Sequence, residues 1–84
     1  MITKSLSVSM DRVTAYHVNQ LVSVAAAFES TVCYEVDSKQ ANGKSIIGMI
    51  SLQLKSGQPF TLTVSGVDEV QATEALEDAI AKLK

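Results

Sequence analysis

Hydrophobic and polar residues alternate along several stretches of the chain. The alternation spans residues 2–10, 31–37 and 60–65, where serine, threonine and other polar residues separate apolar ones. Successive side chains of a strand point to opposite faces, so this pattern predicts strands with one buried face. A shorter strand over roughly 39–42 completes a predicted hairpin with the second strand, across a turn at 37–38.

Two other stretches carry apolar residues at the helical spacing i, i+3, i+4 and i+7. They predict helices over roughly 15–27 and 69–82. Thr14 is a suitable N-cap for the first helix, because its hydroxyl group can accept a hydrogen bond from a free amide of the first turn. Asp68 followed by Gln71 fits a capping box at the start of the second.

A third helix, of about two turns, is predicted after Ser45, which is also a preferred N-cap. Its apolar residues point in nearly every direction around a helix, so only one face, at Met49 and Leu52, packs on a sheet. The remaining apolar side chains are expected to be exposed, and an exposed apolar patch usually marks a partner surface. The isoleucine patch, as we call it, consists of Ile46, Ile47 and Ile50. A loop or a second copy of the chain that covers the patch is the alternative.

The predicted order of elements is therefore β-α-β-β-α-β-α. This order indicates an α+β fold in which the first and last helices cover one face of a four-stranded, mostly antiparallel sheet. With 84 residues and no visible linker or internal repeat, the chain is expected to form one domain over 1–84.

Composition and charge narrow the classes of function. Seven basic residues against nine acidic ones give a net charge of −2, which argues against direct binding of nucleic acid. The apolar runs are far shorter than the roughly 20 residues that span a bilayer, and no signal peptide is visible, so we expect a cytoplasmic protein without membrane insertion. One cysteine and one histidine favour neither a metal site nor a cofactor.

The stretch 42–52, which reads NGKSIIGMISL, is similar to the regulatory-serine signature of the histidine-containing phosphocarrier protein (HPr) family of the bacterial sugar phosphotransferase system. The exit of the first helix at 29–30 and the entry to the last helix at 66–69 resemble the same family. The resemblance covers nearly the whole chain. It implies the HPr-like open-faced β-sandwich and a protein that is not an enzyme.

The chain departs from this family at the position of the phosphate-carrying histidine. Aligned without gaps, that position falls on Thr14, the neighbouring alanine is kept as Ala15, and the arginine and proline that follow become Tyr16 and His17. Threonine cannot form a high-energy phosphoramidate, and Tyr16 lacks the guanidinium that clamps phosphate oxygens. We therefore expect the phosphocarrier activity to be lost. A phosphocarrier that uses the displaced His17 is an alternative.

The resemblance implies regulation through phosphorylation of Ser45, as in the catabolite-repression HPr-like (Crh) branch, which keeps the serine and lacks the histidine. A serine at a helix start places its hydroxyl group where free amides favour negative charge. The implied partners are a bifunctional kinase/phosphorylase and a catabolite-control transcription factor. Lys44, Tyr16 and the isoleucine patch are the expected partner-binding residues, although Tyr16 replaces an arginine that the Crh branch usually keeps.

Two further alternatives remain open at this point. The chain is an unphosphorylated protein-interaction module if no kinase recognises Ser45. It forms a homodimer if it exchanges its first strand as Crh-like relatives can.

Overall fold

The computed structural model of the chain describes residues 1–7, 14–52, 54 and 57–82. The elements follow the predicted order: β1 (Ile2–Ser7), α1 (Ala15–Ala26), β2 (Thr31–Val36), β3 (Lys39–Asn42), α2 (Ile46–Leu52), β4 (Pro59–Ser65) and α3 (Glu69–Ala81). The α+β fold is thus confirmed, and the bounds agree with the expected ones to within one residue at most ends. The exception is the first strand, whose predicted last residues, 8–10, lie outside the described part of the chain.

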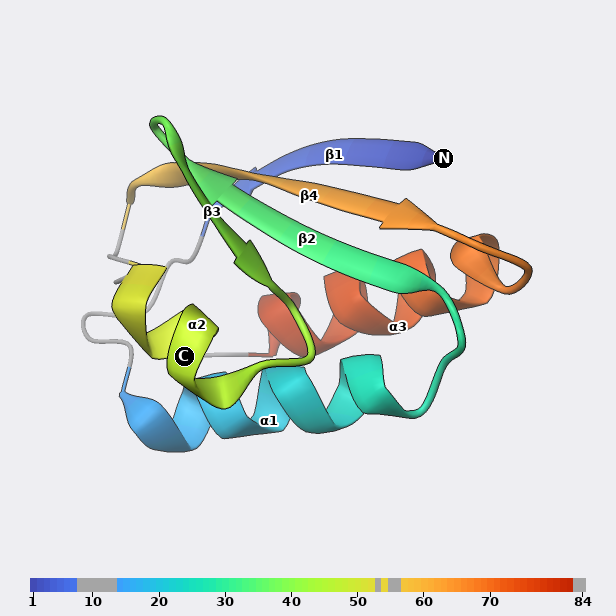
Figure 1. Cartoon of the computed structure of the whole chain (residues 1–84), viewed down its shortest axis with the longest axis horizontal. Coiled ribbons are helices and arrows are strands. Elements are labelled where there is room, and N and C mark those ends of the chain that lie inside the picture. Colours follow the sequence, from blue (N-terminus) through green and yellow to red (C-terminus); the bar gives the residue numbers. More distant parts are fainter. Residues whose placement is uncertain (8–13, 53, 55–56, 83–84) are drawn as a thin grey trace.

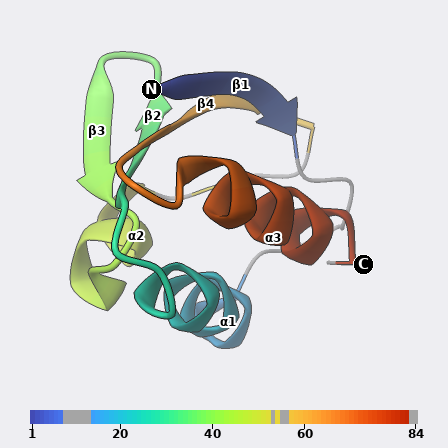
Figure 2. The same ribbon diagram turned by 90° about the vertical axis from the view of Figure 1, so that its right-hand side faces the viewer.

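The four strands form one sheet in the order β1-β4-β2-β3, and all three neighbouring pairs are antiparallel. Figure 1 shows α1 and α3 beneath one face of this sheet, and Figure 2 shows them side by side, with α2 below β3 and next to α1. The helices therefore cover a single face, as predicted. The register puts Phe60, Leu62 and Val64 of β4 on that face, where all three are buried.

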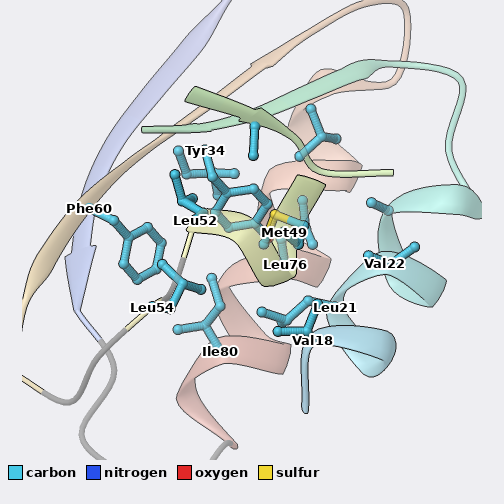
Figure 3. Close-up of a cluster of buried hydrophobic side chains, with 14 of the residues drawn as sticks. Val18, Leu21, Val22, Tyr34, Met49, Leu52, Leu54, Phe60, Leu76 and Ile80 are labelled. Carbon is cyan, nitrogen blue, oxygen red and sulfur yellow. The ribbon is translucent and has the colours of Figure 1, made fainter. Parts of the chain in front are cut away.

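The core lies between the sheet and the helices (Figure 3). Its largest fully buried side chains come from both layers: Tyr34 and Leu62 from the sheet, and Leu21, Met49 and Leu76 from α1, α2 and α3. Burial of a side chain of this size stabilises the folded state by about 1.5–3 kcal/mol. All three helices are thus held to the sheet through the same apolar cluster.

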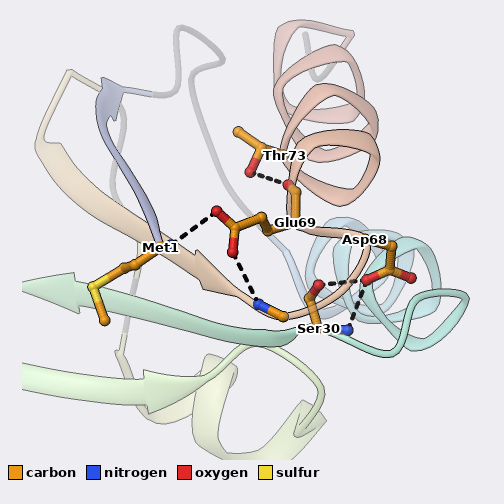
Figure 4. Close-up of polar contacts among 6 residues, drawn as sticks. Met1, Ser30, Asp68, Glu69 and Thr73 are labelled. Atoms are coloured by element: carbon orange, nitrogen blue, oxygen red, sulfur yellow. Dashed lines mark hydrogen bonds and ion pairs between the residues drawn. The ribbon is translucent and has the colours of Figure 1, made fainter.

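The predicted capping box at Asp68 is wrong. Asp68 occupies the N-cap position of α3 but makes no side-chain cap bond. Its carboxylate instead accepts a hydrogen bond from the Glu29 amide at 2.9 Å. It also accepts two from Ser30, one from the amide at 2.9 Å and one from the hydroxyl group (Figure 4). Gly66 makes this approach possible, because a Cβ atom there would lie 2.6 Å from Ser30 Cα. Asp68 therefore ties the α1–β2 connection to the start of α3.

Candidate functional site

Ser45 directly precedes α2 and caps it. Its hydroxyl oxygen accepts a hydrogen bond from the Gly48 amide at 3.2 Å, and its carbonyl group accepts one from the Met49 amide at 3.0 Å. A Cβ atom at position 48 would lie 3.3 Å from the hydroxyl oxygen, so glycine leaves room for this close contact. The N-cap predicted from the sequence is confirmed, and the Ser45 side chain is half-buried.

Asn42 holds the backbone that leads into Ser45. Its side-chain oxygen accepts a hydrogen bond from the Lys44 amide at 2.9 Å, and its carbonyl group accepts one from the Ser45 amide at 3.0 Å. Both amides of the turn are thereby satisfied by one residue, which is a common role of asparagine in turns. The position of Ser45 relative to β3 is consequently fixed by local bonds.

The Lys44 side chain makes a hydrogen bond within the protein. Its ammonium group donates a hydrogen bond to the carbonyl oxygen of Phe28 at 2.7 Å, just beyond the end of α1. A cation near the carbonyl end of a helix is electrostatically favourable. The sequence predicted Lys44 as a partner-binding residue. The structure shows that its charge is engaged within the molecule.

The apolar residues of α2 separate into two faces, as the sequence predicted. Met49 and Leu52 are buried in the core, whereas the isoleucine patch is exposed: 43% of Ile46, 80% of Ile47 and 46% of Ile50 is accessible to solvent. No loop or helix of the described residues covers these side chains enough to bury them. The isoleucine patch therefore starts at Ile46, the residue that directly follows the capping Ser45.

The start of α1 carries the residues that the resemblance aligns with a phosphate-carrying histidine and its neighbours. The Thr14 amide donates a hydrogen bond to His17 Nδ1 at 3.1 Å, and the Thr14 hydroxyl oxygen lies 2.9 Å from the same nitrogen. His17 thus stands three residues after the N-cap, where a capping box usually has glutamate or glutamine. Because Nδ1 accepts from an amide, the neutral ring carries its proton on Nε2. The sequence contained this spacing, but histidine is not the usual partner, and the contact was not predicted.

Tyr16 lies on the first turn of α1 with 67% of its surface exposed. Its hydroxyl oxygen accepts a hydrogen bond from the Gln20 side-chain amide at 3.1 Å, and its ring meets that of His17 edge-on at 5.6 Å between centroids. Tyr16, His17 and Thr14 therefore form one local group at the start of α1. Ser45 and the isoleucine patch form another at the start of α2.

Metal binding finds no support in the described part of the chain, where no group of three or more histidine, cysteine, aspartate or glutamate side chains is placed to hold an ion. Cys33 is a free, half-buried thiol on β2. Among the described helices, none is both long and apolar enough to cross a membrane.

Comparison with known proteins now identifies the family. A family model described as "PTS HPr component phosphorylation site" matches residues 13–82. The chain belongs to the HPr family. The "Phosphocarrier protein HPr" of Lysinibacillus sphaericus is 45% identical over 65 residues, which are 77% of this chain and 74% of that protein. The resemblance stated from the sequence is therefore confirmed.

Solved structures of the HPr family have the same fold. The crystal structure of HPr-C-His from Thermoanaerobacter tengcongensis gives a TM-score of 0.92 at 32% identity, over 96% of this chain and 92% of that one. Crh from Bacillus subtilis gives a TM-score of 0.79 at 32% identity, over 100% of this chain and 98% of that one. That Crh is described as a catabolite repression protein and as a dimer with a swapping domain.

Proposed function

We propose that this protein is a regulatory member of the HPr family that is switched by phosphorylation of Ser45 and acts in the cytoplasm by binding other proteins. The observation that carries the proposal is the arrangement on α2. A serine hydroxyl group caps the helix, and an exposed apolar surface, the isoleucine patch, follows it directly. A modification of Ser45 therefore changes the edge of a surface that is suited to a protein partner.

A phosphate group on Ser45 changes that surface in a defined way. It adds a charge of about −1.5 to −2 and three strong acceptor oxygens beside the isoleucine patch. A partner that buries this edge against apolar residues loses affinity, because the charge must be desolvated. A partner that offers arginine or lysine at the edge gains charge-assisted hydrogen bonds. The same site thus selects between two kinds of partner.

The start of α1 supports the loss of the histidine phosphocarrier activity. Thr14 stands at the expected position of the phosphate-carrying histidine, and Tyr16 stands where the family has an arginine. His17 is the alternative residue to carry the phosphate. Its Nδ1 atom accepts a hydrogen bond from the Thr14 amide. Phosphorylation at Nδ1 would break that contact, because a substituted nitrogen can no longer accept a hydrogen bond. A role of His17 as phosphocarrier remains the second candidate function.

The proposed partners are a kinase/phosphorylase of the family, which adds and removes the phosphate, and a catabolite-control transcription factor that binds the phosphorylated form. The isoleucine patch and Tyr16 supply exposed contacts for them. Self-association is proposed as well. β1 is an edge strand with most of its residues exposed, and Crh of Bacillus subtilis, a relative of the same fold, crystallised as a swapped dimer.

Kinase treatment tests the proposal directly. Incubation with ATP and an HPr-family kinase is expected to add the mass of one phosphoryl group to the wild-type chain and none to Ser45→Ala. Ser51→Ala is the matched control, because Ser51 is an exposed serine on the same helix and its loss should leave phosphorylation intact. Phosphotransfer from the upstream enzyme of the system, abolished by His17→Ala, would favour the second candidate instead.

A further inference from the structure

The hydrogen bond between Lys44 and Phe28 joins two parts of the molecule that are far apart in sequence. The Lys44 ammonium lies 2.7 Å from the Phe28 carbonyl oxygen, and the Phe28 amide in turn donates to the Ala25 carbonyl group at 3.2 Å. Phe28 also packs against the core. The residue directly before Ser45 is thus attached to the exit of α1.

The backbone around Lys44 is held independently of its side chain. The Lys44 and Ser45 amides are both bonded to Asn42, and the Met49 amide is bonded to the Ser45 carbonyl group. These contacts do not involve the Lys44 ammonium. The side chain therefore has freedom to change its partner without disrupting the turn.

We propose that Lys44 is a positioning residue whose ammonium group leaves the Phe28 carbonyl oxygen and pairs with the phosphate when Ser45 is phosphorylated. The inference rests on the proposed function, because it presupposes a phosphate at this position. Its physical basis is the difference between the two acceptors. The carbonyl group of Phe28 offers only a dipole, whereas the phosphate offers nearly two negative charges one residue away. A bond between two full charges is shorter and stronger than one to a neutral acceptor.

The exchange would carry the signal from Ser45 to the rest of the surface. Without phosphate, Lys44 ties the start of α2 to the exit of α1. With phosphate, this tie is released, while Met49 and Leu52 still hold the buried face of α2 in the core. A partner that contacts both helices then meets a Phe28 carbonyl oxygen at the exit of α1 that Lys44 no longer occupies. A partner that contacts α2 alone does not.

Carbon-13 chemical shifts test the exchange in the whole protein. Phosphoserine is incorporated at position 45 during synthesis, so that the sample does not depend on any kinase. The Phe28 carbonyl resonance is expected to move upfield, as it does when a carbonyl group loses a hydrogen bond. It should reach the value found in unphosphorylated Lys44→Met, which lacks the ammonium group. The Asp78 carbonyl resonance is the internal control, because this group accepts a hydrogen bond from the Lys82 amide at the end of α3 and takes no part in the exchange.

The comparison of the wild-type chain with and without phosphoserine at position 45 is decisive by itself. The test therefore remains valid even if the Lys44→Met variant folds poorly. An unchanged Phe28 resonance in the phosphoserine protein overturns the inference, and so does an equal shift when phosphoserine is placed in Lys44→Met. Lys44→Arg, which keeps a cation, should retain the phosphate-dependent shift. Failure of a kinase to modify Ser45 would contradict the proposed function and leave this result untouched, so the two failures are distinguishable.

Discussion

Ser30 donates two hydrogen bonds to the same carboxylate oxygen of Asp68, one from its backbone amide at 2.9 Å and one from its hydroxyl group (Figure 4). The serine is fully buried, and the two residues are 38 positions apart. Their contact joins the exit of α1 to the entry of α3. The two helices that cover the sheet are thereby linked at one end as well as through the core.

Ser30→Ala tests the strength of this link. The substitution removes the hydroxyl donor and keeps the backbone amide, so we expect the free energy of unfolding to fall by about 1.5–3 kcal/mol, the range for a hydrogen bond to a charged group. Urea denaturation measures the change. Ser5→Ala, at an exposed serine of β1, is the control and should stay within about 0.5 kcal/mol of the wild type. Equal values for both variants would show that the Ser30 hydroxyl group contributes nothing.

The titration of the Asp68 carboxyl group is expected to make the free energy of unfolding depend on pH. The hydrogen bonds from the Ser30 hydroxyl group and the Glu29 amide hold the pKa of its carboxyl group below the ordinary value of 3.8. Because the folded state binds this proton less readily, the unfolded state takes up more protons as the pH falls. The stabilisation is therefore complete above the ordinary value and is lost as the pH falls through the folded-state pKa.

Asp68→Asn should flatten the acid side of the stability curve, since asparagine does not titrate. Thermal unfolding at a series of pH values measures the slope, and Glu74→Gln, at an exposed position of the same helix, is the control. A wild-type slope that persists unchanged in Asp68→Asn would mean that other groups are responsible. Glu69, whose pKa is lowered by the Met1 amino group and the Gly66 amide, is the first of these to test.

Tyr34 is a fully buried residue whose hydroxyl group has no hydrogen-bond partner among the described residues. Burial raises the pKa of Tyr34, so the group stays neutral, but its hydroxyl group has still been desolvated without compensation. We expect Tyr34→Phe to raise the free energy of unfolding by about 1 kcal/mol. Tyr16→Phe, at an exposed tyrosine, should change it by less than about 0.5 kcal/mol. A clear loss of stability in Tyr34→Phe would reveal a partner for the hydroxyl group.

The isoleucine patch is expected to contribute to binding and not to stability. Ile47 is the most exposed of its three residues, so Ile47→Ser should leave the free energy of unfolding within about 0.5 kcal/mol and weaken binding of the kinase at least several-fold. Met49→Ala, on the buried face of the same helix, should instead cost about 2–5 kcal/mol of stability. Calorimetric titration with the kinase measures the affinity. Unchanged affinity of Ile47→Ser would remove the patch from the proposed interface.

The sequence predicted the division of α2 because the division depends on local spacing. Residues 49 and 52 share one side of a helix, and a small domain has room to bury only one side. The role of Asp68 was missed for the opposite reason. Its sequence neighbours fit a capping box, whereas its actual partner, Ser30, is distant in sequence and comes close only in the folded chain. Periodicity carries no information about such a pair.

The two helix starts show the same limit within the candidate site. The capping role of Ser45 follows from residue type, since serine is favoured at such positions. The bond from Lys44 to the Phe28 carbonyl oxygen does not, because every residue has a carbonyl group and only the packing of α2 beside α1 selects this one. The contact of Thr14 with His17 is an intermediate case. Its spacing of three residues is that of a capping box, but histidine is not the usual residue at the second position.

Mass spectrometry of the intact protein from its native cells is the most direct test of Ser45 as the phosphorylation site. The sample must be kept at neutral pH, so that any phosphohistidine survives, and then fragmented to locate the phosphate. The proposed function predicts one phosphoryl group on Ser45 in a fraction of the molecules that changes with the carbon source, and none on Thr14 or His17. A phosphate on His17, or an unmodified chain under every growth condition, would contradict it.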